Sequence, residues 1–428
     1  MTEEQFLGEI QKEKPDVIGL SCTSYSFLTS IELLRKLKEV LHDVVIVLGG
    51  IHVTFFAEKI VENYPFVDFV VKGEGEITFS KLIENLNNRN ELRRISGVTF
   101  IDNGRIISNR EELISDLNSL PFPDRKLVEN NDYAHYWFGF RLTLGRFTTI
   151  LSSRGCPYKC SFCCCSPLFK RKWRARSAEN VLDELEEIYS QGYRSCIFVD
   201  DNFTLIPERV IEICRGIVKR KIKMDMHCEG RVGKVSLEVL KEMKNAGFST
   251  IYFGIESGTQ KVLDYYEKDI TIKQIKDSVR MAKKAGLNVI GSFIIGAPIE
   301  TRQDVLQTLE LAKELRIIIQ LNQLGIVPGA KLWTNLEESG SIKNDDWKQA
   351  HNATEYYDNF SEKDLSDLAN LGYNFQIKMF ATPKAIMDII TFLSGNNMKT
   401  LLWNIFRNPV SIIRLLAKLK KGGFRPFS

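Results

Sequence analysis

Five of the nine cysteines in this 428-residue chain lie in one fifteen-residue stretch, SSRGCPYKCSFCCCS. Cys156, Cys160 and Cys163 have the spacing C-x3-C-x2-C. Three soft thiolates suit either an iron–sulfur cluster or zinc. A zinc site usually completes its tetrahedron with a fourth Cys or His, whereas a [4Fe-4S] cluster held by three cysteines leaves one iron open. The spacing therefore predicts a metal centre, with iron and zinc as the alternatives.

The composition is that of an ordinary globular protein, with 44% hydrophobic and 26% charged residues and length enough for two or three domains. The formal net charge of +4 gives no global field that would attract nucleic acid. An odd cysteine count without an apolar N-terminal leader predicts a reducing, cytoplasmic setting. Asp388, Lys399 and Arg407 interrupt the C-terminal apolar stretches, so we expect no transmembrane segment.

Residues 16–88 alternate β-branched runs with amphipathic helical stretches, which is typical of βαβ units on a parallel sheet. The runs are DVIGLS, TSIELLRKLKEVL, VVIVLGG, TFFAEKIVENY, VDFVVKG and EITFSKLIENLNN. Residues 92–118 are predicted to form a small β-rich extension that turns at Asn103-Gly104. The two prolines of LPFPDRK, residues 120–126, mark a linker.

A second alternating series predicts a partial (β/α) barrel, whose chemistry lies at the carboxyl ends of the strands. Strands are expected near 147–152, 195–200, 223–228, 250–256, 289–295 and 320–327. Helices are expected near 178–190, 207–220, 236–246, 272–286 and 301–315. The cysteine segment directly follows the first of these strands, where a barrel presents its active site.

These patterns together predict an α/β fold in four parts. The parts are a Rossmann-like (flavodoxin-like) parallel-sheet domain at 1–119, a linker at 120–146, a partial (β/α)6 TIM-type barrel at 147–335 and a mostly helical region at 336–428.

The segment CPYKCSFC resembles the C-x3-C-x-aromatic-C signature of radical S-adenosylmethionine (SAM) enzymes. The resemblance implies that Cys156, Cys160 and Cys163 hold a [4Fe-4S] cluster and that the amino and carboxylate groups of SAM chelate its open iron. In that family the reduced cluster cleaves SAM to a 5′-deoxyadenosyl radical. An external electron donor such as flavodoxin or ferredoxin, and a small-molecule substrate, are therefore expected partners.

Within the signature, Phe162 matches the aromatic residue that borders the adenine of SAM, and ordinary loop packing is the alternative. Cys164 and Cys165 lie outside the signature, and we interpret them as loop residues rather than ligands.

Four further strand ends carry residues that the resemblance places around SAM: FVDDNFT, HCEGR, YFGIESG and GSFIIGAPIET. A cation suits the SAM carboxylate, and an acceptor suits the ribose hydroxyls. The expected SAM contacts are Asp200, Asp201, Asn202, Arg231, Glu256 and Gly296.

Each of these contacts has an alternative. Asp200, Asp201 and Asn202 can instead cap the following helix, and an ordinary surface ion pair would explain Arg231 and Glu256. The fifth-strand motif also departs from the family, because an isoleucine stands at position 299 where glycine is usual.

The stretches PDVIGLSCTS, VVIVLGGIHVT and VKGEGE resemble the cobalamin-binding domain that precedes the barrel in a large radical SAM subfamily. Its members include methyltransferases and the anaerobic magnesium-protoporphyrin ester cyclase. The resemblance implies that small residues let the backbone approach the cofactor at the carboxyl edge of the sheet. The expected cobalamin contacts are Ser21, Thr23, Gly49, Gly50 and Gly73.

Domains of this type begin with a strand and a helix before the PDVIGLS strand, and here only about fifteen residues precede it. We therefore expect an open sheet edge, weak cobalamin retention and a separately encoded N-terminal fragment as a possible partner. The D-x-H-x-x-G pattern that supplies a lower cobalt ligand in some relatives occurs only at Asp225–Gly230, on a barrel strand. We expect no histidine ligand to cobalt.

Two basic stretches have alternative interpretations. FKRKWRARS, residues 169–177, can bind RNA or form a solvated rim, and we favour the rim. NPVSIIRLLAKLKKGG, residues 408–423, suits a peripheral membrane contact or docking on the barrel.

The predicted function is cobalamin-dependent methylation or C–H remodelling of a small molecule, a tetrapyrrole or a lipid. A cobalamin-independent radical SAM enzyme and a non-catalytic metal-binding module are the alternatives.

Overall fold

The computed structural model describes residues 2–128, 131, 133, 136–137, 140–141 and 145–380. The chain divides into two compact units, each of which is built from separate chain segments. Unit 1 comprises residues 1–116, 160–172 and 325–352. Unit 2 comprises residues 117–159, 173–324 and 353–428. The predicted basic stretch at 408–423 lies outside the described residues.

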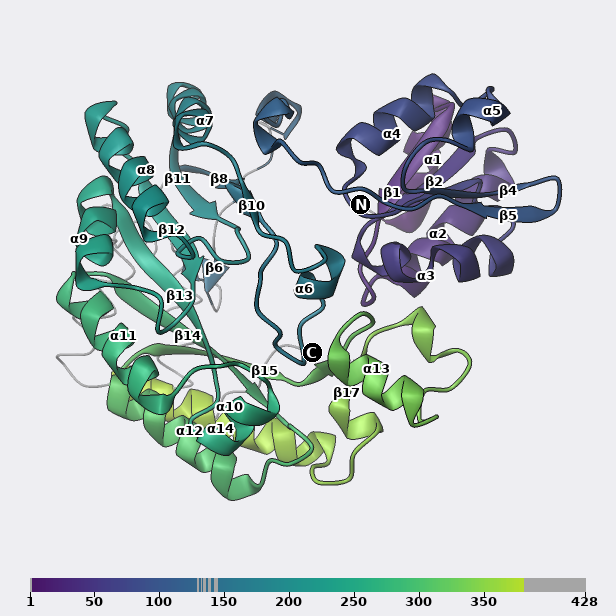
Figure 1. Cartoon of the computed structure of the whole chain (residues 1–428). Coiled ribbons are helices and arrows are strands. Elements are labelled where there is room, and N and C mark those ends of the chain that lie inside the picture. Colours follow the sequence, from purple (N-terminus) through teal and green to yellow (C-terminus); the bar gives the residue numbers. More distant parts are fainter. Residues whose placement is uncertain are drawn as a thin grey trace. The chain divides into compact units, whose positions relative to one another are not determined.

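Unit 1 contains a five-stranded sheet in the order β1-β2-β3-β4-β5 (Figure 1). The parallel strands are β1 (Val17–Ser21), β2 (Val45–Gly49) and β3 (Phe69–Val71). Antiparallel β4 (Val98–Asp102) and β5 (Arg105–Ser108) complete it. The helices are α1 (Glu3–Glu13), α2 (Phe27–Val40), α3 (Ile51–Asn63), α4 (Gly75–Glu84) and α5 (Arg89–Leu92).

The predicted hairpin is present between β4 and β5. Asn103 and Gly104 both have positive φ, 49° and 73°, as a two-residue type I′ turn requires.

Residues 325–352 pack into unit 1 although they follow the barrel in sequence. They form β16 (Gly325–Ile326), α13 (Lys331–Glu338) and β17 (His351–Asn352). The Trp347 ring lies 5.7 Å from the Phe27 ring and 5.3 Å from the Phe56 ring, centroid to centroid. Gly329, at φ +83°, lies so close to Phe55 that a Cβ atom would come within 2.2 Å of its ring. This segment therefore completes the aromatic core of unit 1.

Unit 2 is built on a six-stranded parallel sheet in the order β15-β14-β13-β12-β11-β8. Its strands are β8 (Arg146–Ile150), β11 (Tyr193–Phe198), β12 (Asp225–Gly230), β13 (Phe248–Glu256), β14 (Asn288–Ile295) and β15 (Ile318–Gln323). The helices that follow these strands are α7 (Ala178–Ser190), α8 (Pro207–Lys219), α9 (Leu237–Ala246), α10 (Gln260–Tyr265), α11 (Ile272–Lys284) and α12 (Arg302–Leu315). Figure 1 shows these helices along one face of the curled sheet. The sheet is thus the predicted half-barrel.

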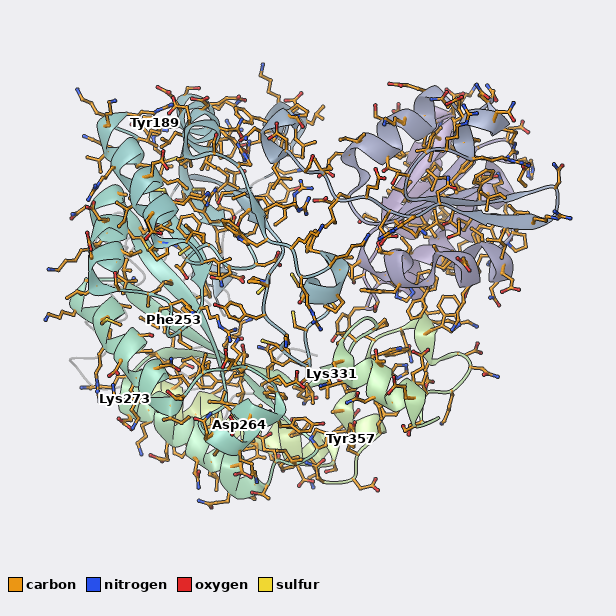
Figure 2. All side chains as sticks on the ribbon, viewed as in Figure 1. Tyr189, Phe253, Asp264, Lys273, Lys331 and Tyr357 are labelled. Carbon is orange, nitrogen blue, oxygen red and sulfur yellow. The ribbon has the colours of Figure 1, made fainter. Side chains whose placement is uncertain are left out.

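The core of unit 2 lies between the sheet and its outer helices. Alternate residues of each strand face this core, as the buried Phe253 of β13 does (labelled in Figure 2). The other residues of each strand face the concave side. Lys273 of α11 is exposed.

The last described helix, α14 (Glu362–Phe380), packs against α12 and the edge strand β15. Tyr373 Oη donates to the carbonyl of Leu321 at 3.2 Å, and Gln376 Oε1 accepts from the Ile319 amide at 3.3 Å. Two free backbone groups of an edge strand are thereby satisfied by side chains of a covering helix.

The remaining short elements are β6 (Tyr136–Trp137), β7 (Phe140–Arg141), β9 (Ser153–Arg154), α6 (Cys165–Leu168) and β10 (Arg174–Ala175). Among the described helices none is both long and apolar enough to cross a membrane.

Candidate functional site

The cysteine loop follows β8 and the short strand β9 at the carboxyl edge of the half-barrel sheet. All three candidate ligands are cysteines of intermediate exposure. Cys163 N donates to the Cys160 carbonyl at 3.1 Å, which forms a turn between two of them. Cys156 belongs to unit 2, and Cys160 and Cys163 belong to unit 1. In the described residues no three His, Cys, Asp or Glu side chains form a metal-binding group, so the gathering of these thiols stays a prediction.

The chemistry of the donor set fits an iron–sulfur cluster. Four of the other cysteines are buried in the cores, and burial raises the pKa of Cys22 to about 11 and raises the pKa of Cys196, Cys214 and Cys228 further. Such thiols resist the deprotonation that metal binding requires. The thiols within reach of a cluster are therefore those of the loop, where Phe162 is also half-buried.

Asp200 and Asp201 contact the polypeptide at the start of this loop. Asp200 accepts from the Ser152 amide at 2.7 Å and the Ser152 hydroxyl at 2.6 Å, and also from the Ser153 hydroxyl. Asp201 accepts from the Gly155 amide at 2.7 Å. These contacts bind the carboxylates to the loop rather than to the start of the following helix.

Asn202 differs from Asp200 and Asp201 because one of its buried polar atoms has no hydrogen-bond partner among the described residues. Its Oδ1 accepts from the Thr204 hydroxyl at 3.3 Å. Its Nδ2 is buried and has no hydrogen-bond partner among the described residues. A buried amide donor without a partner is costly, so this group fits a ligand that brings an acceptor.

Arg231 and Glu256 meet the same residue, Lys268, just beyond the ends of β12 and β13. Lys268 Nζ lies 2.6 Å from Glu256 Oε1, and Arg231 donates to the Lys268 carbonyl. The Arg231 guanidinium also lies 3.7 Å from the centre of the Tyr158 ring, within the cysteine loop. All three charged residues are buried, so the surface-pair alternative does not apply.

Glu256 has φ +65°, a left-handed conformation that is unusual for a residue other than glycine, and the ladder shifts register beside it. Strain of this kind is retained mainly where function requires it.

Gly296 lies at the end of β14 with φ +96°. Its amide donates to Glu300 Oε2 at 2.7 Å, and the Ala297 amide donates to the same oxygen at 3.2 Å. The other carboxyl oxygen of Glu300 is buried without a hydrogen-bond partner in the described residues. Burial is the main reason that the pKa of Glu300 is raised to about 7. Ile299, at the unusual position, is exposed.

The candidate cobalamin residues lie at the carboxyl ends of β1, β2 and β3. Ser21 and Thr23 are exposed. Gly50 has φ +100°, and a Cβ atom there would come within 2.5 Å of the Cys22 carbonyl oxygen. Gly73 has φ +68°, and its amide donates to the Thr54 hydroxyl at 2.9 Å. Gly49, Gly50 and Gly73 place no side chain at three positions of this edge, which lets a large flat cofactor approach the backbone there.

Neither His52 of unit 1 nor His227 of unit 2 is exposed as a metal ligand would be. His52 is fully buried, and its Nδ1 lies 3.0 Å from the Ser24 hydroxyl. His227 is buried on β12, with its Nε2 3.4 Å from Asp225. The D-x-H-x-x-G match is thus part of a barrel strand.

Sequence reasoning missed Lys268, Tyr158, Glu300 and Arg209, each of which contacts the site residues. Tyr158 lies in CPYKCSFC and Glu300 lies in GSFIIGAPIET. A polar or aromatic residue inside such a motif could therefore have been predicted to contact the site. Lys268 lies in the loop after α10 and Arg209 lies in α8, and neither belongs to a quoted motif.

Two family models match the chain. The model described as the radical SAM superfamily matches residues 150–312, and the model described as the B12 binding domain matches residues 1–83.

Curated relatives extend over both matched regions. Uncharacterized methyltransferase PH0819 of Pyrococcus horikoshii is 33% identical over 386 residues, which is 89% of this chain and 82% of the relative. The anaerobic magnesium-protoporphyrin IX monomethyl ester cyclase of Cereibacter sphaeroides is 28% identical and covers 73% of this chain. The chain spans about half of that cyclase, 51%.

Among solved structures, the cobalamin-dependent SAM radical enzyme OxsB with aqua-cobalamin and SAM bound matches with a TM-score of 0.71. It is 21% identical, and the match covers 98% of this chain and 69% of OxsB. This similarity shows the fold.

Proposed function

Because the chain belongs to the radical SAM superfamily and carries a B12-binding domain, we propose that it is a cobalamin-dependent radical SAM methyltransferase acting on a small molecule. The observation that carries the proposal is the set of three half-buried cysteines, spaced C-x3-C-x2-C, in the loop that follows the first half-barrel strand. Membership of an enzyme family replaces the alternative of a non-catalytic metal-binding module.

Cys156, Cys160 and Cys163 would hold a [4Fe-4S] cluster, which supplies the electron that cleaves SAM to a 5′-deoxyadenosyl radical. Cobalamin, when bound, supplies a methyl carrier. The residues of this chain bind and orient SAM and cobalamin.

We assign the SAM contacts from the polar groups that the structure leaves available. The Asn202 Nδ2 donor suits the SAM carboxylate. Lys268 Nζ donates to Glu256 Oε1, and the other carboxylate oxygen, Oε2, suits a ribose hydroxyl. Arg231 contributes positive charge beside the cysteine loop, the Gly296 backbone approaches the adenine, and Phe162 borders it.

Ser21, Thr23, Gly49, Gly50 and Gly73 would form the edge on which cobalamin lies. The exposed hydroxyls can bond to the polar periphery of the cofactor, and the glycines allow its close approach.

The substrate class follows the relatives, which include enzymes named for a cytidylyl phosphonate and for hopanoid C-3 methylation as well as the cyclase. We propose a carbon centre of a small molecule as the methyl acceptor and a flavodoxin or ferredoxin as the electron donor. A cytoplasmic, reducing setting suits a chain with nine cysteines, an odd number.

Anaerobic reconstitution with iron and sulfide tests the cluster. About four irons per chain are expected, since three cysteines and SAM complete one [4Fe-4S] centre. Cys156→Ala, Cys160→Ala or Cys163→Ala should abolish iron binding, and Cys164→Ala and Cys165→Ala are the matched controls that should retain it. Stoichiometric zinc without iron absorbance would contradict the proposal.

The radical chemistry is tested by reducing the loaded protein with SAM and measuring 5′-deoxyadenosine. Glu256→Gln and Asn202→Leu should weaken SAM binding about tenfold while the iron content stays constant, because each removes one hydrogen bond to SAM. Loaded protein that neither binds nor cleaves SAM would show that the catalytic assignment is wrong.

A further inference from the structure

The first residues of the cysteine loop are held by an acidic pair at the end of the neighbouring strand. Asp200 is fully buried, and both of its oxygens accept hydrogen bonds from Ser152 or Ser153. Carboxylates bonded to a backbone amide and two hydroxyls are fixed in direction. The chain is therefore fixed at Ser152, four residues before the first candidate ligand.

Asp201 extends this restraint to the residue next to Cys156. Its Oδ2 accepts from the Gly155 amide at 2.7 Å. Gly155 has φ +86°, a conformation that costs other residues energy, so the turn into Cys156 has a defined shape. Asp201 is exposed. Its side chain can therefore be replaced to remove this hydrogen bond without leaving a cavity in the core.

Arg209 of α8 holds the same segment from the other side. Its Nη2 donates to the Ser152 carbonyl at 2.8 Å and its Nε donates to the Arg176 carbonyl at 3.1 Å. The Arg176 amide donates to the Ser152 carbonyl at 3.0 Å. Burial raises the pKa of Asp200, opposed by its serine hydrogen bonds and the Arg209 charge. The segment is therefore clamped between two strands and a helix of unit 2.

We propose that Asp200 and Asp201 are positioning residues that hold the entry of the cysteine loop in the shape required for Cys156 to ligate the cluster, and that they do not contact SAM. The inference rests on the proposed function, because it assumes that Cys156 is a cluster ligand. It assigns to these two residues a role different from the expected contact with SAM. Both oxygens of Asp200 and Oδ2 of Asp201 accept hydrogen bonds from the polypeptide, whereas the neighbouring Asn202 has a buried donor without a partner among the described residues.

The test uses the full chain carrying Asp201→Ala, Asp201→Asn or Ser152→Ala, with Asp277→Asn on the outer helix α11 as the control. Asp277 is partly exposed and pairs with Lys273, far in sequence from the loop. Each protein is reconstituted anaerobically, and iron release to a chelator and SAM dissociation from cluster-loaded protein are measured. We expect Asp201→Ala to release iron about tenfold faster, Asp201→Asn and Ser152→Ala to have smaller effects, and SAM affinity per loaded cluster to be unchanged.

Hydrogen exchange of the cluster-free protein gives a second measurement that does not depend on activity. The Gly155 amide should lose protection in Asp201→Ala and keep it in Asp277→Asn. Weaker SAM binding with normal iron retention would overturn the inference and make the pair SAM ligands. Normal iron retention, SAM affinity and exchange in all variants would also overturn it. If the unsubstituted protein binds no iron but Asp201→Ala still exposes the Gly155 amide, the proposed function fails while the restraint on the loop stands.

Discussion

A single buried carboxyl, Glu300, should make the stability of the protein depend on pH. Its pKa is raised from about 4.5 to about 7, mainly by burial, so the folded state favours the neutral form. The stabilisation is present below the unfolded pKa and is lost as the pH rises through about 7. The whole effect is about 3 kcal/mol. We expect Glu300→Gln, which imitates the neutral carboxyl, to flatten the dependence of the unfolding midpoint between pH 5 and 7.

The matched control is Glu310→Gln, on the exposed face of α12. Its midpoint should follow that of the unsubstituted protein at every pH. Glu300→Gln should become the more stable protein above pH 7, because the amide can still accept from the Gly296 and Ala297 amides without carrying a charge. Parallel pH profiles for Glu300→Gln and the unsubstituted protein would show that Glu300 is ionised in the folded state.

For single residues, the sequence predicted which side chains belong to the site but not which residues they contact. The loop cysteines stood out because five of them share fifteen residues. Asp200 and Glu256 were identified as acceptors, yet their contacts with Ser152 and Lys268 involve residues 48 and 12 positions away. Such pairings depend on how strands and loops pack, and no local pattern records them.

At the scale of elements, the linker motif LPFPDR has a structural role in unit 2. Arg125 is buried, and its guanidinium lies 2.6 Å from Glu184 of α7 and 2.9 Å from the Thr149 carbonyl. Removing one partner of a buried ion pair commonly costs 3–5 kcal/mol. We expect Arg125→Met to lower the free energy of unfolding of unit 2 by about 3 kcal/mol, since Glu184 keeps Arg176 as a second partner. Chemical denaturation followed by circular dichroism measures this change.

Arg220→Met is the control for this prediction. Arg220 also contacts several carboxylates, those of Glu179, Asp183 and Glu186, but these partners are exposed to solvent. Water screens such pairs, so the denaturation midpoint should change little. Equal losses in the two variants would contradict the role assigned to burial.

Elements with strong periodicity were predicted closely, and short ones were not. Helix α7 spans the predicted residues 178–190, and α12 begins one residue after its predicted start. The six half-barrel strands also lie within two or three residues of their predicted starts. The short elements β9, β10 and α10 were missed because two to six residues carry too little pattern to distinguish them from loops.

At the scale of the whole molecule, the sequence predicted two αβ parts in succession, and the structure interleaves them. Residues 160–172 and 325–352 belong to unit 1. Trp347 packs on Phe27 of α2 and Phe56 of α3, which precede it by about three hundred residues. Contacts of such long range leave no periodic signal in the segments that make them. The second half of the cysteine loop therefore belongs to the same compact unit as the B12-binding domain.

This interleaving also governs how cobalamin can be held in unit 1. Burial lowers the pKa of His52 to about 4, so its imidazole is neutral at neutral pH, the form that binds metals. The ring is nevertheless closed in by aromatic side chains, with Phe27 at 4.1 Å and Trp347 stacked at 6.1 Å between ring centroids. Cobalt could reach His52 only if this aromatic cluster opened. The packing therefore predicts cobalamin bound without a histidine ligand from the protein.

The prediction is tested by loading the protein with hydroxocobalamin, desalting it, reducing it to cob(II)alamin and recording electron paramagnetic resonance spectra. The spectrum should show no nitrogen hyperfine splitting that depends on His52, and His52→Ala should leave it unchanged. The same variant should lower the thermal midpoint, because it empties space in a fully buried cluster. Trp347→Phe, which keeps an aromatic ring over His52, is the control for the spectrum and should leave it unchanged. Nitrogen splitting that disappears in His52→Ala would mean that the cluster opens on binding, and would make His52 the lower ligand.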